Sequence, residues 1–454
     1  MREPPRTPRS RHRRYARIRR VAPAAIVIGL LAPACSSTPA TTTSHGNTVL
    51  NMWSTLTASD AQEWAKMIGA FNKANDGKGL HEQIKLTTIA NNYSTKVAAA
   101  VATGHAPNFG WGTAGEEALW AKQGVIIPLN SLAKQVSFNL SDFSAASLRD
   151  AEYPAIGGSK FYLLPMDSSS FAMEINVTEA KAAGLNPAKP PTNGPEFIKW
   201  LKALTIRKNG QVTQAGLVSD TTGIATTLFG IVAAQYGFER VSPDLKTACI
   251  NRPAASKAMN WLLSLFDKYK VITPNVTDPY HTFDTGAGAI MWEGPWTILG
   301  NIQAHLNWES VQLPLIGTQR ATYFEDDGLE VYRQADTSSY IPTMKAIKWL
   351  SDHSFPWTTQ GRGVSPRTSI RAMPGYATAG FPPKYRQAFI DSMPYATVAS
   401  VPTLSTADFE YYSLGTFAVN EVSMVLEHKQ SVSTFVSTVC SKWQQDLNTD
   451  NANS

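Results

Sequence analysis

One short segment in the second half of the chain, residues 286–296, limits most strongly what this sequence can fold into. It reads GAGAIMWEGPW, so an apolar run is enclosed by glycines and ends abruptly at Gly294-Pro295. Proline has no backbone N–H to donate to a sheet, and its fixed φ suits the first turn of a helix. The segment therefore predicts a buried strand that ends near Gly294, with a helix opening at Pro295.

Two tryptophans, Trp292 and Trp296, lie where this strand meets the helix. Large, rigid aromatic side chains at the end of a buried strand are typical of ligand clefts, where they stack on an apolar or sugar face. Two tryptophans of a hydrophobic core would give the same pattern. The segment alone therefore leaves both interpretations open.

The first 34 residues have the pattern of an export signal. Nine arginines precede an uncharged, mostly apolar run at residues 21–34, which is too short to span a bilayer comfortably. Arg13-Arg14 leaves the choice between the general and the twin-arginine export route open. We expect a signal peptide over residues 1–34.

The end of this leader resembles a bacterial lipobox, Leu31-Ala-Pro-Ala-Cys35, although Ala32 stands where a branched apolar residue is usual. We therefore expect Cys35 to carry a lipid. The residues that follow are mostly Ser, Thr, Pro and Ala, so the segment 35–47 is expected to be a flexible tether.

The leader also accounts for the basic composition. The whole chain has a formal net charge of +6, but its first 34 residues contain nine arginines and one glutamate, which leaves −2 for the rest. A function in binding nucleic acid or an anionic surface therefore loses its main support.

The 420 residues after the leader are too many for one ordinary core and indicate two domains. Two cysteines remain, Cys249 and Cys440. Export would permit a disulfide between them. However, Cys440 continues an apolar helical stripe with Val436 and Val439, which favours a buried, unpaired thiol.

Strand and helix patterns alternate from residue 48 onward. Residues 48–53, 83–90 and 108–111 are predicted strands, each followed by a predicted helix. Such alternation predicts an α/β domain with a mainly parallel sheet, whose ligands bind beyond the carboxyl ends of the strands. The residues at these ends are therefore candidates for a site: Trp53 with Ser54, Asn91 with Asn92, and Trp111 with Gly112.

A second unit of strands and helices follows Pro165. Apolar runs flank Pro165-Met-Asp-Ser168, which we expect to cross between two lobes. Residues 448–454 are polar and are expected to fray. Further strands are predicted at 214–219 and 329–332, and helices at 224–236, 254–269, 340–353, 381–392 and within 413–447.

The order of these motifs resembles family 1 extracellular solute-binding proteins, the sugar-binding subunits of bacterial ABC importers that include the maltose-binding type. The similarity runs over residues 47–447, and its most specific motif is Gly286-x-Gly288-Ala289-x-Met291-x-x-Gly294-Pro295-Trp296. Asn108 departs from the acidic residue usual in the family, and residues 393–412 match poorly. The other matching motifs are Tyr93-x-x-Lys96, Gly104-x-x-Pro107, Gly158-x-Lys160-x-Tyr162-x-Leu164-Pro165, Ile175-Asn176, Ala183-Gly184-Leu185 and Gly363-x-x-Pro366-Arg367.

This resemblance implies an α/β, two-lobe periplasmic-binding-protein-like fold (type II), in which each lobe is a mainly parallel sheet flanked by helices. Crossing strands are implied near Pro165 and Met291, with a third crossing around Gln334. Ligand bound between the lobes stabilises a hinge-closed form. The implied segments are 48–165 plus 291–333 for lobe 1 and 166–290 plus 334–447 for lobe 2.

The implied function is that of an extracytoplasmic lipoprotein, anchored to the cell membrane, that captures a mono- or oligosaccharide and delivers it to ABC permease subunits. The resemblance implies a monomer without enzymatic activity, cofactor or metal. Its implied ligand-binding residues are Trp53, Ser54, Asn92, Trp111, Gly112, Asp167, Ser169, Trp292, Glu293, Trp296, Arg367 and Tyr411.

Other functions remain open. The same fold could bind a glycerol-phosphate diester, a polyamine or iron. An anion would require more cations than Arg367, and a polyamine would require clustered carboxylates. A protein that only scaffolds other proteins would bind no small solute.

A secreted glycan hydrolase would require two positioned carboxylates. The adjacent pairs Glu116-Glu117 and Asp326-Asp327 are better explained by a solvated face or a turn. The eight histidines show no metal-ligand spacing, and no serine-hydrolase, zinc-protease or phosphate-loop motif occurs.

Overall fold

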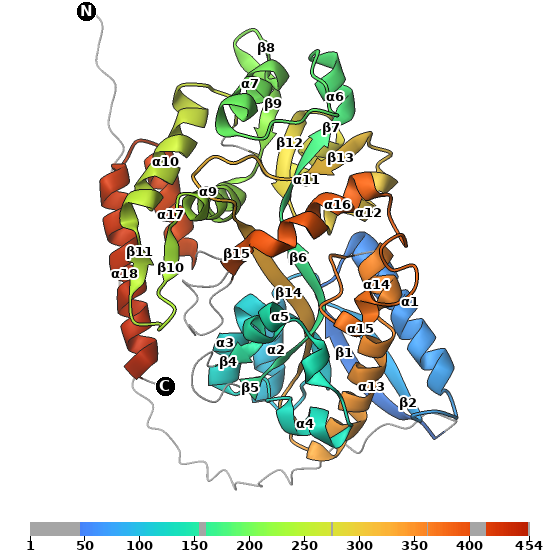
Figure 1. The fold of residues 1–454 in the computed structure, drawn as a ribbon. Coiled ribbons are helices and arrows are strands. Elements are labelled where there is room, and N and C mark those ends of the chain that lie inside the picture. Colours follow the sequence, from blue (N-terminus) through green and yellow to red (C-terminus); the bar gives the residue numbers. More distant parts are fainter. Residues whose placement is uncertain (1–45, 154–159, 274–275, 361, 400–414, 453–454) are drawn as a thin grey trace, which may run out of the picture. The chain divides into compact units, whose positions relative to one another are not determined.

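The computed structural model describes residues 46–153, 160–273, 276–360, 362–399 and 415–452. These residues form an α/β architecture with two main sheets, each of which packs against its own hydrophobic core (Figure 1). None of the helices in these ranges combines the length and the apolar character needed to cross a membrane. Residues 1–34, the predicted signal peptide, lie outside the described residues, as do Cys35 and Tyr411.

The elements in chain order are β1 (Thr48–Ser54), α1 (Ala58–Asn75), β2 (Glu82–Thr88), α2 (Tyr93–Ala102), β3 (Phe109–Thr113), α3 (Ala114–Gln123), α4 (Asn130–Gln135), η1 (Leu140–Asp142), α5 (Ala145–Asp150), β4 (Glu152–Tyr153), β5 (Lys160–Phe161), β6 (Leu163–Ser170), β7 (Ala172–Asn176), α6 (Val177–Ala182), α7 (Gly194–Leu204), β8 (Ile206–Lys208), β9 (Gln211–Val218), α8 (Thr221–Gly223), η2 (Ile224–Leu228), α9 (Phe229–Gln235), β10 (Glu239–Val241), β11 (Ala248–Ile250), α10 (Arg252–Asp267), α11 (Pro279–Asp284), β12 (Gly288–Glu293), α12 (Thr297–Gln303), β13 (Trp308–Val311), β14 (Thr322–Val331), η3 (Thr337–Ser339), α13 (Tyr340–Asp352), α14 (Phe355–Gln360), α15 (Thr368–Arg371), α16 (Pro383–Ser392), η4 (Met393–Tyr395), β15 (Ala396–Ala399), α17 (Gly415–Leu426) and α18 (Val432–Ala452).

The first sheet has the strand order β15-β14-β3-β1-β2, and β6 also pairs with β14. Strand β1 is parallel to both β2 and β3, which confirms the parallel arrangement predicted from the alternating pattern. The core of this sheet contains side chains from α1, β1, β3 and α13. The predicted strand ends at Ser54 and Gly112 therefore lie at one edge of one sheet.

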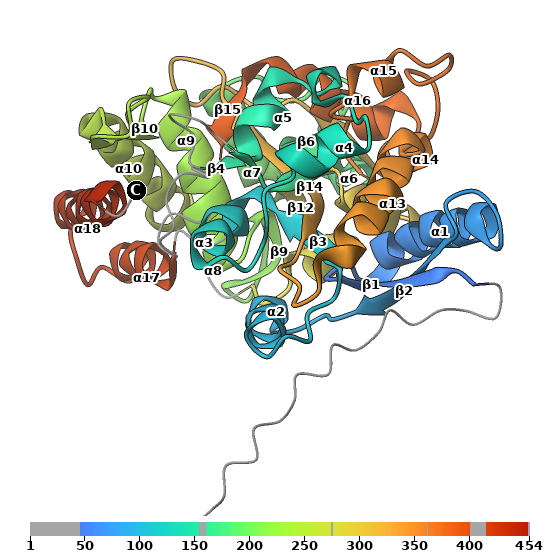
Figure 2. The same ribbon diagram turned by 90° about the horizontal axis from the view of Figure 1, so that it is seen from below.

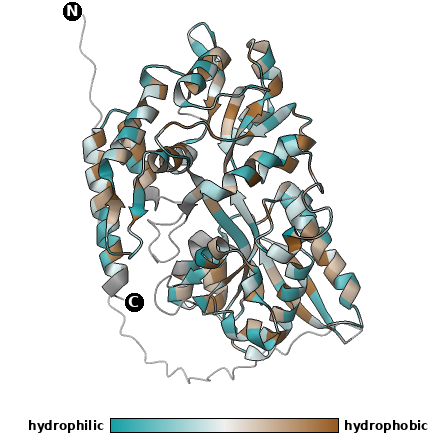
Figure 3. Cartoon of the chain, in the orientation of Figure 1, coloured by the Kyte–Doolittle hydropathy of each residue, from teal (hydrophilic) through white to brown (hydrophobic). Residues whose placement is uncertain are grey.

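Strands β6 and β14 pair antiparallel, and every residue of both strands is buried. The sequence predicts a strand only at 329–332, because the middle of β14 is the acidic segment Glu325-Asp326-Asp327, which interrupts the apolar pattern. Figure 3 shows this hydrophilic stretch within the strand. The prediction of a solvated face or turn for Asp326-Asp327, and for Glu117, is wrong, because all three side chains are buried.

The second sheet has the order β13-β7-β12-β9-β8. Strand β12 is its centre, antiparallel to β7 and parallel to β9. The predicted buried strand is thus confirmed, and the helix α12 begins at Thr297, two residues after Pro295. All residues of β12 except Glu293 are buried.

The sheets do not follow the lobe boundaries implied by the resemblance. The segment 291–333 is predicted in lobe 1, but β12 and β13 pair in the second sheet. The segment 334–447 is predicted in lobe 2, but α13 packs into the core of the first sheet. A strand that is apolar on both faces carries no sequence signal for the sheet it joins, which explains the error.

The chain crosses between the sheets from β6 to β7, with only Phe171 between them, and again from β13 to β14. The crossings predicted at Met291 and Gln334 are therefore wrong. Met291 lies within β12, and the Gln334 side chain donates a hydrogen bond to the carbonyl of Pro107 in the first half of the chain.

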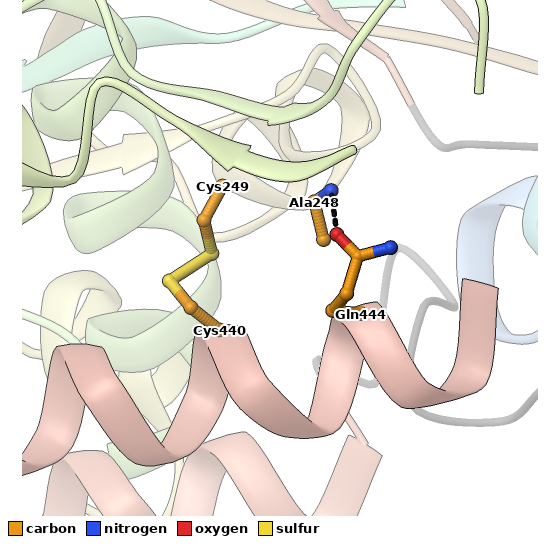
Figure 4. The surroundings of a disulfide bond; sticks show 4 residues. All are labelled: Ala248, Cys249, Cys440 and Gln444. Carbon is orange, nitrogen blue, oxygen red and sulfur yellow. Dashed lines mark hydrogen bonds between the residues drawn. A yellow bond between two sulfur atoms is a disulfide. The ribbon is translucent and has the colours of Figure 1, made fainter. Parts of the chain in front are cut away.

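The C-terminal helices α17 and α18 pack beside α10 on the core of the second sheet (Figure 2). Cys440 of α18 forms a disulfide with Cys249 of β11, and their Cα atoms are 5.6 Å apart (Figure 4). The preference for an unpaired thiol is wrong, because the apolar stripe of α18 faces β11 itself. Helix α18 continues to Ala452, so the described part of the tail predicted to fray at 448–454 is helical.

Candidate functional site

A pocket of about 430 Å³ lies at the carboxyl ends of β9 and β12, the parallel pair at the centre of the second sheet. Asp220 follows β9, and β12 ends at Glu293, three residues before Trp296. Ligands of α/β sheets bind at this edge. The lining residues are Phe171, Asp220, Thr222, Gly223, Thr226, Thr227, Thr277, Asp278, Pro279, Tyr280, Glu293 and Trp296.

Two aromatic side chains with polar atoms, Trp296 and Tyr280, form one wall of this pocket. The Trp296 Nε1–H donates a hydrogen bond to the Tyr280 hydroxyl at 3.4 Å, and the Tyr280 side chain is 44% exposed. The ring of Phe171 meets Trp296 edge to face, with centroids 5.2 Å apart. Phe171 therefore holds the indole in place from the segment that joins the two sheets.

The Glu293 carboxyl group lies between these aromatic side chains and the second carboxylate of the pocket. It accepts hydrogen bonds from the Gly294 backbone N–H and from the side chains of Trp296 and Tyr280. Burial, together with the nearby charge of Asp220, raises the pKa of Glu293 to about 8. At neutral pH this group is therefore largely protonated, so it can donate a hydrogen bond as well as accept one.

Burial of its hydroxyl group, and next the charge of Glu293, raise the pKa of Tyr280. The phenol therefore stays protonated. Its oxygen accepts the hydrogen bond from Trp296, and its O–H remains a donor toward Glu293.

The helix after β9 supplies the hydroxyl groups of the pocket. Asp220 caps it by accepting a hydrogen bond from the Gly223 N–H at 2.6 Å. The helix then widens into a π-helical segment, η2, which carries Thr226 and Thr227. Such segments are rare and occur frequently at functional sites. The sequence predicts an ordinary helix at 224–236 and misses the π-helical hydrogen bonding, although the Thr-Thr pairs on either side of Gly223 indicate the hydroxyl groups.

The start of α11 forms a further side of the pocket, beside the aromatic wall and the helix that follows β9. Asp278 caps this helix by accepting a hydrogen bond from the His281 N–H at 2.9 Å. With Asp220 and Glu293, three carboxyl groups line the pocket, and its lining contains no lysine or arginine among the described residues. The pocket therefore favours neutral or cationic ligands over anions.

Arg362 links Trp296 to the elements of the first sheet. Its guanidinium carbon lies 5.9 Å from the centroid of the Trp296 ring. The same guanidinium forms ion pairs with Asp60 of α1 at 3.2 Å and with Asp327 of β14, and its Nε lies 3.8 Å from Asp167 of β6. The position of the indole is thus coupled to three elements outside its own sheet.

The resemblance implies three ligand-binding residues at the end of β12. Glu293 and Trp296 line the pocket, but Trp292 does not. Trp292 is 3% exposed and stacks on Phe197, with ring centroids 5.5 Å apart. Successive strand residues point to opposite faces, so Trp292 and Glu293 cannot face the same space. Trp292 is a core residue.

Two predictions on β3 are also wrong. Trp111 is 1% exposed and packs edge to face against Trp64, at 4.8 Å, and Trp357, at 5.2 Å. It belongs to the first core. Gly112 faces the Glu330 side chain, which leaves so little room that a Cβ at this position would lie 2.2 Å from it. Neither residue is accessible to a ligand.

The other first-sheet predictions lie at the predicted edge but do not line the Trp296 pocket. Trp53 is half-buried against the core that contains Tyr93 and Tyr332. The Ser54 hydroxyl accepts a hydrogen bond from the Leu56 N–H at 3.2 Å. Asn92 is exposed at the start of α2, with a left-handed φ of 55°.

Three further residues are predicted to bind ligand: Asp167 and Ser169 at the crossing, and Arg367 in the far loop. In the structure they are buried or paired with other protein groups. Asp167 is fully buried, and its carboxylate accepts a hydrogen bond from the Trp357 indole at 2.8 Å. Burial raises the pKa of Asp167 to about 7 despite the opposing effect of Arg362. Ser169 is buried in β6. Arg367 forms ion pairs with Asp142 at 2.7 Å and Asp352 at 2.6 Å, which ties η1 to α13.

The family described as bacterial extracellular solute-binding protein matches residues 66–378. No match is found among curated protein sequences. Within the described ranges, no three His, Cys, Asp or Glu side chains are grouped so that they could hold a metal ion.

Three solved structures illustrate the fold similarity. An ABC substrate-binding protein from Listeria monocytogenes, in complex with cycloalternan, has a TM-score of 0.73 and 21% identity over 88% of this chain and 98% of that chain. The maltose/maltodextrin-binding domain MalE from Bdellovibrio bacteriovorus, bound to maltotriose, has a TM-score of 0.73 and 17% identity over 88% and 100%. The GacH receptor of Streptomyces glaucescens, solved with acarbose, has a TM-score of 0.73 and 17% identity over 88% and 98%. All three share the two-lobe fold.

Proposed function

This chain belongs to the bacterial extracellular solute-binding proteins, and from that premise we propose that it captures a carbohydrate, a mono- or oligosaccharide, in the pocket beside Trp296 and delivers it to an ABC importer. The observation that carries this proposal is the pairing of Trp296 and Tyr280 with Glu293 at the carboxyl end of the central strand. An aromatic ring covers the C–H face of a sugar, and the carboxyl group takes its hydroxyls.

The hydroxyl-rich side of the pocket supports the same ligand class. Asp220, Asp278 and the threonines of η2 offer acceptors and donors in a cavity of about 430 Å³. Each hydrogen bond adds only about 0.5–1.5 kcal/mol net, so several must converge to give a micromolar affinity. The three solved structures described above contain cycloalternan, maltotriose and acarbose, and a further structure of the same fold, CpMnBP1, contains mannotriose.

A second candidate is a polyamine, because three carboxyl groups line the pocket without a lysine or arginine. Two of these carboxyl groups, on Asp220 and Asp278, already accept hydrogen bonds from helix N–H groups, which lessens their need for a cation. A phosphate diester is disfavoured by the same carboxyl groups. Titration with spermidine distinguishes the two candidates, since only a polyamine-binding protein gives a heat of binding.

The first-sheet side of the ligand site remains a proposal. Trp53, Ser54 and Asn92 lie at the carboxyl ends of parallel strands, where a ligand held by Trp296 could be reached after hinge closure. Closure then depends on contacts that the ligand makes with both sheets.

We further propose that the protein binds its solute without turning it over, and that it acts as a monomer. Analysis of candidate oligosaccharides after incubation tests the first point, because any cleavage product would contradict it. We also propose that export leaves Cys35 lipidated and the protein tethered to the outer face of the membrane. Substitution of Cys35 by Ala is then expected to release it into the medium of the producing cells.

Calorimetric titration with a panel of mono- and oligosaccharides tests the proposed function. At least one carbohydrate is expected to bind, and Trp296→Ala is expected to weaken this binding at least about tenfold, which corresponds to about 1.4 kcal/mol. Trp261→Ala is the matched control, because Trp261 is a partly buried tryptophan of the same core outside the pocket. Equal affinities for the two variants would show that the site is elsewhere.

A further inference from the structure

A buried arginine outside the proposed ligand pocket has no counter-charge among the residues that the structure describes. Arg386 of α16 is 6% exposed. Its Nη1 donates a hydrogen bond to the carbonyl of Ala379 at 2.6 Å, and its guanidinium lies 5.8 Å from the ring centroid of Tyr376. Its Nη2 is buried and has no hydrogen-bond partner in the described part of the chain, where Arg386 also forms no ion pair.

Burying a guanidinium group without a counter-charge is energetically unfavourable. A guanidinium removed from water loses its hydration, and a carbonyl and an aromatic face replace only part of it. Arginine does not lose its proton in proteins, so Arg386 cannot escape this cost by becoming neutral. A buried, unpartnered N–H of a cation therefore indicates a negative partner.

A small cavity adjoins Arg386. It has a volume of about 10 Å³, which is room for one occupant of about the size of a water molecule. Its walls come from α12, α14, α16 and the turn at Arg362-Gly363. The lining residues are Pro295, Ile298, Thr358, Thr359, Arg362, Gly363, Phe381, Arg386 and Phe389.

The charge of this lining favours an anion. The O–H groups of Thr358 and Thr359 already donate to helix carbonyls, at 3.3 Å to Ser354 and 2.8 Å to Phe355. Among the described residues, no carboxyl group lines the cavity, whereas two guanidinium groups and four apolar side chains do.

We propose that this cavity binds a monatomic anion of the halide type, held by the Nη2–H of Arg386. The small volume excludes sulfate, phosphate and carboxylates, so chloride is the expected physiological occupant. The occupant would join α16, which packs on β13 of the second sheet, to α14, which packs on α1 and β6. The bound ion would therefore stabilise the contact between α14 and α16. This contact includes Arg362, whose guanidinium group lies over the ring of Trp296.

The carboxylates near Arg362 do not replace this anion. Asp60, Asp167 and Asp327 contact Arg362 and none of them lines the cavity. Burial raises the pKa of all three carboxyl groups. A separate counter-charge for Arg386 is still required.

Thermal unfolding at constant ionic strength tests the proposal. Replacing sodium gluconate by sodium chloride is expected to raise the Tm in a saturable way by roughly 2 °C or more, and bromide is expected to act like chloride while sulfate does not. Arg386→Gln is expected to remove this dependence on chloride. Lys384→Gln is the matched control, because Lys384 is an exposed cation of the same helix and reports general screening.

Crystals of the unsubstituted protein grown in bromide give an independent test, which does not depend on whether Arg386→Gln folds. An anomalous peak within hydrogen-bond distance of Arg386 Nη2 is expected. A water molecule at this position in bromide would overturn the proposal. A Tm that is equal in chloride and gluconate, or a chloride effect that persists in Arg386→Gln, would also overturn it.

Discussion

At the residue scale, the chemistry of the pocket depends on how burial changes one carboxyl group. Glu293 lies at the end of an apolar strand, between two aromatic side chains and a second carboxylate, and its pKa is raised to about 8. A carboxyl group that stays protonated near neutrality can both donate to and accept from a sugar hydroxyl. Its protonation must also make the stability of the protein depend on pH.

The sign of this dependence follows from proton uptake on folding. An unfolded Glu293 ionises near pH 4.5, whereas the folded form holds its proton to about pH 8. The native state therefore binds more protons across this interval, and the free energy of unfolding falls as the pH rises from about 4.5 to about 8.

We predict that Glu293→Gln removes this decrease in the free energy of unfolding at high pH. The variant should be more stable than the unsubstituted protein at pH 9 by about 1–3 kcal/mol, less than the full shift implies because Glu293 is partly exposed. Urea unfolding at pH 5 and pH 9 measures the effect, with exposed Glu239→Gln as control. Parallel pH profiles for Glu293→Gln and the unsubstituted protein would contradict the prediction.

Trp111 gives a contrasting prediction, because it lies among Trp64 and Trp357 in the first core. Trp111→Ala is expected to lower the free energy of unfolding by about 3–5 kcal/mol, since the deletion leaves a large cavity. Carbohydrate affinity at 15 °C should stay within about twofold. Urea unfolding and calorimetry measure the two quantities, and a stable variant that has lost binding would place Trp111 in the site after all.

Trp111 and Trp296 also show why the role of a single residue is hard to predict from sequence. Trp111 and Trp296 both lie near the end of a short strand, but Trp111 is inside its strand and faces the core, whereas Trp296 lies beyond its strand. Strand ends are uncertain by a few residues from sequence alone, and a shift of one residue reverses the face. Arg367 is predicted as a ligand contact for another reason: its ion-pair partners Asp142 and Asp352 lie 225 and 15 residues away, where the local sequence pattern does not show them.

At the element scale, the segments with regular patterns are predicted and those with irregular backbone are not. Strands β1, β2, β3 and β12 follow from apolar runs bounded by Gly, Pro and Asn. The π-helical segment η2 has no such signal, because it differs from an α-helix only in its hydrogen bonding. Only the end of strand β14 is predicted, because the buried carboxyl groups in its middle resemble those of a polar loop.

The disulfide between β11 and α18 fixes the C-terminal helix to the second core across 191 residues of sequence. Such a link restricts the unfolded chain and typically contributes about 2–4 kcal/mol. We predict that Cys249→Ala combined with Cys440→Ala lowers the free energy of unfolding by about this amount.

Carbohydrate affinity should be unchanged in this double variant, because neither cysteine lines the pocket. Dithiothreitol should destabilise the unsubstituted protein and leave the double variant unaffected. If the reductant has no effect on the unsubstituted protein at full reduction of its thiols, the stabilising role is wrong.

At the scale of the whole molecule, two sheets share few connections. The chain passes directly from β6 to β7, returns from β13 to β14, and Arg362 adds a link from α1, β6 and β14 to Trp296. A ligand held by Trp296 therefore sits beside the elements that would move in hinge closure. The two-lobe fold could be predicted from the motif order, whereas the lobe boundaries could not, because β12 is apolar on both faces.

The most direct test is a crystal structure of the protein with the carbohydrate that binds most tightly in calorimetry. We expect a sugar ring stacked on Trp296, with a hydroxyl group within hydrogen-bond distance of Glu293 and further contacts from the first-sheet edge at Trp53 or Asn92. A carbohydrate bound away from Trp296, or held by residues of the first sheet alone, would contradict it.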